Sequence, residues 1–418
     1  MSSKSLTICT IFRDEEEFLE EFLDCCIPYA DQLVLVDTGS RDSSLDLLRK
    51  RGVQWESFPW AGDFSKAKNY ALSRATGAWV LFLDADERLL PEDFSLLKEL
   101  LPNLREEGFL LQVLSTRTRD WRTKERKLQS VQNHLRLFRN FRGYQYRYKI
   151  HEVIVESIEE VGGATRDLEG IPIYHLGYCD DLMQTKIDRN IPLIEKDYQQ
   201  DPTDPRNILY YAYSIMGPDP TVLTHLKEGW SQSHKGFALE LTQAILEWFL
   251  DFGVPVTEDL SLWESRMLSL QSPSAAVSIH RGRKAYEEED IHTAQQHYAV
   301  ARKHLNQFPH GKYHHEVLDR LIVLLAMDGD FDKSLGCIEE YIRFHGRTAG
   351  IYHLLLKVCY ALGDYSRFGK EALNPPGDLS ELEDRKKEEL YSLAQNCPCA
   401  QEPNFLDRLH AILAGESQ

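Results

Sequence analysis

The residues best suited to chemistry are two aspartates that flank one small residue, Asp84-Ala85-Asp86. They directly follow residues 79–83, an apolar run that predicts a buried strand. Two carboxylates at a strand end can converge on Mg²⁺ or Mn²⁺, which prefer oxygen ligands and bridge readily to a diphosphate. Because Asp-x-Asp alone is more often a solvated turn, its place after this apolar run is what favours a metal–diphosphate site.

Asp37 and a basic segment are the next candidates. Asp37 follows the apolar run 32–36, where its carboxylate could accept hydrogen bonds from a nucleobase or ribose, or help to cap the following helix. Farther along, Ser65 could cap a helix whose N-terminus, with Lys66 and Lys68, faces phosphates. A solvated basic helix face would explain the two lysines equally well.

The elements that must position these residues alternate along the first part of the chain. Apolar runs predict strands at residues 5–12, 32–36, 52–58 and 79–83, and the segments between them predict helices. Such alternation is typical of βαβ units around a parallel sheet. Parallel sheets bind ligands beyond the carboxyl ends of their strands, which is where Asp37 and Asp84 lie.

From about residue 108 the predicted strands no longer alternate with helices. They cover residues 109–115, 135–138, 144–155 and 172–176, and a highly charged stretch, residues 117–127, separates the first two. We interpret them as an antiparallel extension that completes the sheet and forms the second wall of a cleft.

Beyond about residue 182 the periodicity is helical throughout. Gly329-Asp330-Phe331 and Gly363-Asp364-Tyr365 lie 34 residues apart, each between two helical stretches. This period, with Gly-Asp-aromatic at the turn, resembles tetratricopeptide repeats, and Glu289-Asp290-Ile291 could be a degenerate earlier turn. Residues 204–212 could open the array. A generic helical bundle with a coincidental spacing is the alternative.

The length, composition and charge of the chain limit which classes of protein it can belong to. The chain has 418 residues, enough for two or three domains, and its 42% hydrophobic and 27% charged residues are ordinary for a globular protein. This composition excludes a disordered, collagen-like or small disulfide-stapled chain. With Lys+Arg 48 and Asp+Glu 66, the formal net charge of −18 disfavours a general nucleic-acid binder.

The cysteines and the apolar segments indicate in which cellular compartment the protein lies. Of eight cysteines only Cys397 and Cys399 are closely spaced, so we expect reduced, mostly buried thiols rather than a zinc site. No segment approaches the ~20 apolar residues of a membrane span, and the first residues lack the apolar core of a signal peptide. We therefore expect a cytoplasmic protein.

Four segments together are more specific than any one of them. TICTIFRDEE, LVLVDTGSRD, FSKAKNYAL and WVLFLDADE resemble, in order and spacing, the motifs of family 2 glycosyltransferases over about residues 5–90. The resemblance implies a GT-A nucleotide-diphospho-sugar transferase domain, an α/β domain with a Rossmann-like mixed sheet. We expect this catalytic domain at residues 1–182 and an all-α tetratricopeptide-like domain at residues 183–418. The resemblance also implies a nucleotide-sugar donor, first of all a UDP-sugar, and a Mg²⁺ or Mn²⁺ cofactor.

The second half of the domain is similar to a subgroup with a His-Glu pair, here His151-Glu152, and a later aromatic-His-x-Gly-Tyr, here residues 174–178. The subgroup carries C-terminal helical repeats and includes bacterial enzymes that build surface polysaccharide or lipopolysaccharide core, and others that glycosylate bacteriocin peptides on Cys or Ser. An inverting transfer needs one general base. Glu152 is the first candidate, with His151 and Arg147 placed to tune its pKa, and Glu87 is the second. A plain surface glutamate is the alternative at Glu152.

Roles for single residues follow from the motifs and the resemblance. The expected donor-binding residues are Arg13, Asp14, Asp37, Lys66, Lys68, Asp84 and Ala85, and the expected metal ligands are Asp84, Asp86 and His175. The family usually carries Asn-Glu-Glu where this chain has Arg13-Asp14-Glu15. His175 could instead be a packed, hydrogen-bonded histidine. Arg136 and Arg139 could hold the diphosphate or the acceptor, or form exposed ion pairs.

The expected activity is that of an inverting, metal-dependent hexosyltransferase. It would move a sugar from a nucleotide-diphosphate sugar to a saccharide, lipid-linked or peptide acceptor. A non-catalytic tetratricopeptide scaffold with an inactive GT-A domain is the alternative. The helical region would supply a concave groove for an extended acceptor, or the interface of a homodimer.

Overall fold

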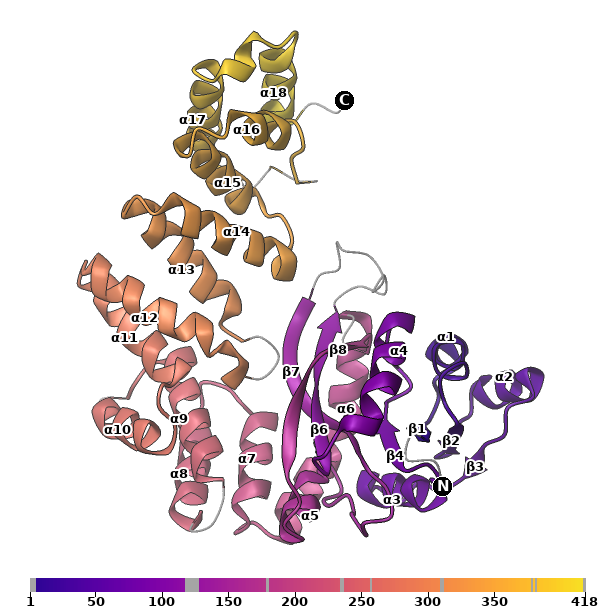
Figure 1. The fold of residues 1–418 in the computed structure, drawn as a ribbon. Helices are drawn as coiled ribbons and strands as arrows, with labels where there is room; N and C mark the ends of the chain where they lie inside the picture. The colour runs from indigo at the N-terminus through magenta and orange to yellow at the C-terminus, as the bar shows by residue number, and fades with distance from the viewer. Residues whose placement is uncertain are drawn as a thin grey trace. The chain divides into compact units, whose positions relative to one another are not determined.

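The chain forms two compact units, Met1–Ser214 and Ile215–Gln418. The computed structural model describes residues 5–116, 128–177, 180–233, 237–255, 258–308, 312–376, 379 and 382–415. Figure 1 shows the sheet in the first unit and helices throughout the second. The charged stretch 117–127 and Tyr178 lie outside the described residues.

A mixed sheet forms the centre of the first unit. Its eight strands, among the described residues, lie in the order β3-β2-β1-β4-β7-β6-β8-β5. The strands are β1 (Leu6–Phe12), β2 (Gln32–Asp37), β3 (Glu56–Ser57), β4 (Trp79–Phe82), β5 (Glu87–Arg88), β6 (Gly108–Thr116), β7 (Leu128–Arg139) and β8 (Thr165–His175). The first four strands run parallel, and β7 joins β4 in antiparallel orientation. The predicted parallel sheet with an antiparallel extension is therefore confirmed.

Helices cover both faces of this sheet. They are α1 (Glu16–Cys26), α2 (Ser44–Arg51), α3 (Phe64–Arg74), α4 (Pro91–Leu100), η1 (Leu101–Asn103), α5 (Val155–Glu160), α6 (Asp180–Gln200) and α7 (Pro205–Ser214). Alternate residues of β1 and β4 pack on opposite faces: Ile8 and Leu81 join α1 and α4 in one core cluster, while Cys9 and Phe82 join α3 and α5 in the other. Burial on both faces explains why these strands read as unbroken apolar runs.

Two strand predictions fail in part. The run 144–155 is not a strand: it contains an isolated bridge between Arg147 and Val153, and α5 begins at Val155. Tyr148 (φ 71°) and His151 (φ 51°) have left-handed backbone, which a regular strand does not contain. The run 52–58 contributes only Glu56 and Ser57 to the sheet.

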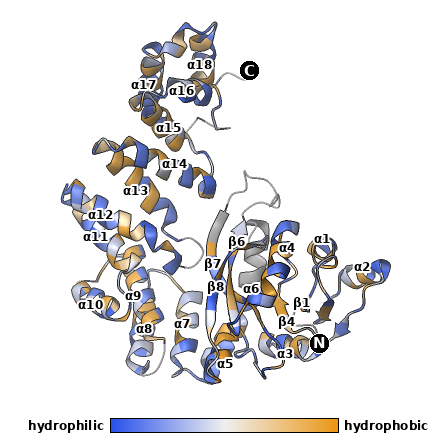
Figure 2. Cartoon of the chain, viewed as in Figure 1, coloured by the Kyte–Doolittle hydropathy of each residue, from blue (hydrophilic) through white to orange (hydrophobic). Residues whose placement is uncertain are grey.

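The described part of the second unit is helical. Its elements are α8 (Pro220–Gln232), α9 (Ala238–Phe252), α10 (Leu260–Leu270), α11 (Ala275–Glu287), α12 (Ile291–Lys303), η2 (Leu305–Gln307), α13 (His314–Met327), α14 (Phe331–His345), α15 (Ala349–Ala361), α16 (Tyr365–Ala372), α17 (Asp384–Gln395), η4 (Pro398–Gln401) and α18 (Phe405–Ala414). Hydrophobic and hydrophilic residues alternate around these helices, as expected where each buries one face (Figure 2).

The repeat turns predicted from the sequence are present. Asp330 caps α14 at the N–H of Lys333, and Asp364 caps α16 at the N–H of Arg367. The glycines before them have φ of 80° and 70°, a conformation that glycine adopts without strain. In the degenerate turn Glu289 takes the same conformation, with φ of 58°, and Asp290 caps α12. Residues 204–212, predicted to open the array, instead form α7 of the first unit.

Cysteine pairing differs from the prediction at one place. Cys397 and Cys399 form a disulfide, whereas Cys9, Cys25, Cys26, Cys337 and Cys359 are free thiols. The expectation of reduced thiols is therefore wrong for that pair. Among the described helices, none has both the length and the apolar character needed to cross a membrane.

Candidate active site

The acidic turn lies between β4 and β5 at the carboxyl end of the parallel strands. The N–H of Glu87 donates to the carbonyl of Asp84 (2.9 Å), and the N–H of Asp84 donates to Glu87 Oε2 (2.9 Å). Strand β5 pairs with β8 so that Glu87 lies opposite His175. This register brings the aromatic-His motif next to the Asp-x-Asp motif, more than 80 residues earlier in the sequence.

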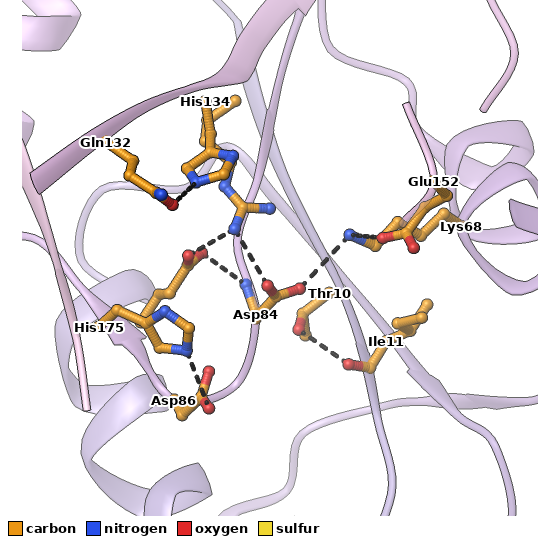
Figure 3. Close-up of polar contacts among 11 residues, drawn as sticks. Thr10, Ile11, Lys68, Asp84, Asp86, Gln132, His134, Glu152 and His175 are labelled. Atoms are coloured by element: carbon orange, nitrogen blue, oxygen red, sulfur yellow. Dashed lines mark hydrogen bonds and ion pairs between the residues drawn. The ribbon is translucent and has the colours of Figure 1, made fainter. Parts of the chain in front are cut away.

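Asp84 lies between two cations, as Figure 3 shows. Its Oδ1 is 3.5 Å from Lys68 Nζ, and its Oδ2 is 3.1 Å from Arg136 Nη2. Arg136 Nη2 also pairs with Glu87 Oε1 at 2.5 Å. Burial by itself would raise the pKa of Asp84, but Lys68 and Arg136 more than offset it and hold the pKa below its ordinary value. Asp84 is therefore an anion at neutral pH.

Lys68 joins Asp84 to Glu152. Its Nζ is 2.7 Å from Glu152 Oε1, and it lies over the rings of Phe82 (4.9 Å) and Tyr146 (5.4 Å). Burial would lower the pKa of this amine, but Asp84 and Glu152 raise it further than burial lowers it. The side chain is only 6% exposed, so Lys68 is a buried, charged bridge between two carboxylates.

The N-terminus of α3 differs from the prediction in its cap. Asp63, not Ser65, is the N-cap, and it accepts from the N–H of Lys66; Ser65 Oγ donates to the same carboxylate at 2.7 Å. The Lys66 side chain is exposed and pairs with Asp63 at 3.4 Å. Of the two predicted lysines, Lys68 therefore lies among the site carboxylates and Lys66 lies on the helix surface.

Asp86 and His175 form the other side of the site. His175 Nε2 lies 3.3 Å from Asp86 Oδ2, and the N–H of Leu176 donates to the Asp86 carbonyl (2.9 Å). Over the residues that the structure describes, no three His, Cys, Asp or Glu side chains gather in a way that could hold a metal ion. Mg²⁺ is often held by one or two carboxylates together with substrate phosphates and water. Asp86 with His175 fits such a shared cation, while the Asp84 oxygens face Lys68 and Arg136.

The loops after β1 and β2 are joined by side chains. Phe12 pairs with Asp37 in the sheet, and Asp37 Oδ1 accepts from the N–H of Ser40 (2.9 Å). Asp14, whose φ is 55°, accepts from the N–H of Arg41 at 2.6 Å. Arg13 pairs with the carboxylate of Asp14 at 3.5 Å. These predicted donor-binding residues therefore lie in one loop pair that Asp14 holds together.

The two residues of the His-Glu pair contact different partners. Glu152 faces Lys68, whereas the exposed ring of His151 stacks on Tyr210 with 4.1 Å between centroids and 11° between planes. Arg147, expected beside Glu152, pairs with Glu160. The second candidate base, Glu87, is fully buried, and burial raises its pKa despite Arg136. Glu152 is 14% exposed and is therefore the more accessible carboxylate.

Strand β7 contributes site residues that the sequence analysis did not assign or assigned only as alternatives. Arg136 forms a buried ion pair with Asp84 and Glu87, not an exposed one, and Arg139 packs away from these carboxylates over the ring of Trp79 (4.4 Å). Gln132 and His134 lie on the same strand (Figure 3), and His134 is close enough for the charges of Arg136 and Asp84 to act on it. The predicted strand, residues 135–138, contained Arg136 but not Gln132 or His134, because β7 begins earlier, at Leu128.

The chain is similar in sequence to one family model and to several known proteins. Residues 7–157 match the family model Glycosyl transferase family 2. A TPR repeat-containing protein of Synechococcus elongatus is 32% identical over 186 residues, which is 43% of this chain and 44% of that protein. The SPbeta prophage-derived glycosyltransferase SunS of Bacillus subtilis is 21% identical over 235 residues, 54% of this chain and 53% of the relative. The chain thus spans about half the length of the curated relatives that it matches.

Two solved structures show weaker likeness. S. aureus TarS 1-349, crystallised with UDP-GlcNAc, gives a TM-score of 0.36 at 13% identity over 71% of this chain and 90% of that one. Glucosyl-3-phosphoglycerate synthase of Mycobacterium tuberculosis, crystallised with Mn²⁺ and UDP-glucose, gives 0.24 at 20% identity over 27% and 43%. The eight-stranded mixed sheet with its helices has the predicted GT-A architecture. The match to the Glycosyl transferase family 2 model covers residues 7–157, which hold β1 to β7 and the segment that carries Glu152.

Proposed function

We propose that this protein is an inverting glycosyltransferase that moves a hexose from a nucleotide-diphosphate sugar, in the first place a UDP-sugar, to a hydroxyl or thiol of an acceptor. One observation carries the proposal: within a family 2 domain, Asp84 and Glu152 come from distant segments and share the buried cation Lys68. A scaffold without activity would have no need to bury such a charged cluster, because charges are costly to remove from water.

Donor binding would use the loops at the carboxyl ends of β1, β2 and β4. Asp37, at the end of β2, would accept hydrogen bonds from the nucleobase or ribose, and Asp86 with His175 would supply two ligands to Mg²⁺ or Mn²⁺. When bound, such a cation would neutralise charge on the departing diphosphate. Lys68 and Arg136 contribute fixed positive charge beside the acidic turn.

The transfer step assigns the base role to Glu152. The acceptor oxygen or sulfur attacks the anomeric carbon from the face opposite the diphosphate, and Glu152 takes the proton that the acceptor loses. The bond between the anomeric carbon and the diphosphate oxygen breaks, its electron pair remains on the diphosphate, and the configuration inverts. Glu87 suits this role less, because it is fully buried and its two oxygens are occupied by Arg136 and the Asp84 N–H.

The helical unit would serve the acceptor or assembly. Capped helix pairs of the tetratricopeptide kind stack into arrays that bind extended ligands, which suits a peptide or saccharide acceptor. A homodimer through this unit and a cytoplasmic location are part of the proposal. The expected domain boundary at residues 182 and 183 lies within α6, whereas the compact units divide after Ser214.

Calorimetry with UDP and Mn²⁺ tests the donor site. Wild type should bind UDP only when Mn²⁺ is present, and Asp86→Ala should weaken that binding at least about 10-fold, because it removes one of two protein ligands. Asp328→Ala, at an exposed aspartate of the second unit, is the matched control and should bind like wild type. Equal binding by Asp86→Ala and wild type would contradict the metal role of Asp86.

A further inference from the structure

The segment that carries Glu152 has an unusual backbone. It leaves the sheet after β7, and two of its residues, Tyr148 and His151, have positive φ (71° and 51°) without being glycine. Such conformations persist only where the surrounding structure enforces them. Other parts of the first unit must therefore hold residues 144–153 in this conformation. The hydrogen bonds on the two sides of the segment identify them as helices α3 and α7.

Helix α3 holds one side of the segment. Asn69 Nδ2 donates to the carbonyl of Tyr146 (2.8 Å), and the N–H of Tyr146 donates back to Asn69 Oδ1 (2.7 Å). The N–H of Phe64 donates to the carbonyl of Lys149 (2.8 Å). These bonds fix the backbone of the first half of the segment, and beyond Lys149 helix α3 meets the segment at the ion pair of Lys68 with the Glu152 side chain.

Helix α7 contacts the other half through Tyr210, which stacks on the His151 ring, and through Arg206, which bonds the backbone. Arg206 Nη2 donates to the carbonyls of Ile150 (3.0 Å) and His151 (2.6 Å), and its guanidinium lies 3.6 Å from the centre of the Tyr148 ring. The residue is 4% exposed. Because the His151 carbonyl belongs to the peptide group that ends at the Glu152 nitrogen, Arg206 fixes the peptide plane from which the Glu152 side chain starts.

We propose that Arg206 is a positioning residue for Glu152, an inference that rests on the proposed function of Glu152 as the base. By holding the Ile150 and His151 carbonyls, Arg206 keeps the Glu152 carboxylate beside Lys68 and directed at the acceptor. Lysine cannot replace it, since an ammonium lacks the planar group that stacks on Tyr148 while it donates to two carbonyls. Displacement of a catalytic group by about 1 Å can cost about 100-fold in rate.

The test compares Arg206→Lys and Arg206→Gln with wild type. Turnover is measured as UDP released from the best hydrolysed member of a panel of UDP-sugars with Mn²⁺, so that no acceptor need be known. Donor affinity is measured by calorimetry with UDP and Mn²⁺. Hydrogen exchange reports the amides of residues 147–153, among them the Arg147–Val153 bridge. Arg283→Gln is the matched control, because Arg283 also donates to a carbonyl, that of Leu250, but within the second unit.

Both Arg206 variants should lower kcat, Arg206→Gln by about 100-fold, with the affinity for UDP changed less than about twofold. Exchange should accelerate within residues 147–153, and Arg283→Gln should leave kcat unchanged. Wild-type kcat in a variant whose segment exchanges faster would overturn the proposal. So would a parallel loss of UDP affinity, since Arg206 would then support the fold or the donor site and not Glu152.

A double variant separates this inference from the base assignment. If Arg206 acts through Glu152, adding Arg206→Gln to Glu152→Gln should lower kcat no further, because residues that act as a unit are not additive. Additive losses would overturn the positioning role while leaving Glu152 as the base. Full turnover by Glu152→Gln alone would overturn the base assignment, and this inference with it.

Discussion

Replacement of Lys68 by methionine tests whether the buried ion pairs of Lys68 with Asp84 and Glu152 stabilise the first unit. Lys68 Nζ lies 2.7 Å from Glu152 and 3.5 Å from Asp84, and its side chain is 6% exposed. Removing one partner of a buried ion pair costs about 3–5 kcal/mol, because the remaining charge stays out of water without compensation. Methionine keeps the apolar stem beside Phe82 and Tyr146, so little of this loss comes from packing. We expect a loss of that size at pH 7.

The loss should depend on pH in one direction. Burial opposes ionisation of Asp84, but Lys68 and Arg136 hold its pKa below the ordinary value. A carboxyl group whose pKa falls on folding stabilises the protein above its unfolded pKa of about 3.9, and this contribution is lost as the pH falls through the folded pKa. Without Lys68, Asp84 loses one of the two cations that lower its pKa and therefore binds a proton more readily. The difference between variant and wild type should therefore stay constant from pH 7 to about pH 4 and shrink below about pH 4, as the pH falls toward the lowered pKa of Asp84.

Hydrogen exchange of the slowest amides in β1 and β4 measures this loss, because these amides report the unfolding free energy of the first unit alone. Lys66→Met is the matched control: Lys66 lies on the same helix and pairs with Asp63, but its side chain is exposed. Its loss should stay below about 1 kcal/mol. An effect of Lys68→Met below about 1 kcal/mol at pH 7, or one that does not shrink below about pH 4, would refute the proposed ion-pair role of Lys68.

Two further predictions concern the base and the repeats. Glu152→Gln should bind UDP with Mn²⁺ like wild type and release UDP from a UDP-sugar about 100-fold more slowly or worse, because an amide cannot accept the proton; near-normal turnover would eliminate Glu152. Asp364→Ala should cost the second unit about 1 kcal/mol, since Asp364 caps α16 at the N–H of Arg367 (3.0 Å), and should leave UDP binding intact. Unchanged amide exchange in α16 would show that this cap contributes nothing.

The site residues that could be predicted from the sequence are those at the carboxyl ends of predicted strands. Asp37 and Asp84 were assigned to the carboxyl ends of parallel strands from apolar runs alone, and β1 pairs in parallel with both β2 and β4. The local rules behind this assignment, periodicity and burial on both faces of a sheet, act over a few residues and are visible in the sequence. The repeat turns at Asp330 and Asp364 were predictable for the same reason.

The segment 144–155 shows where such rules stop. Tyr144 and Tyr146 alternate with polar residues and are both buried, as in a strand. The backbone nevertheless takes another course, because Asn69 bonds both polar groups of Tyr146 and Arg206 bonds the carbonyls of Ile150 and His151. Partners from helices far away in the sequence thus satisfy groups that a neighbouring strand would otherwise have paired.

The sequence alone was enough to predict the order of most strands and helices, the acidic turn and the helical repeats. It also identified the charged residues that could form the site. The partners of those charges were decided only in three dimensions. Lys68 could have faced solvent or phosphate, and it pairs with Asp84 and Glu152 because α3, β4 and the segment before α5 meet at one end of the sheet. A charge removed from water must find an opposite charge within a few ångströms, and which one lies there depends on how distant segments pack.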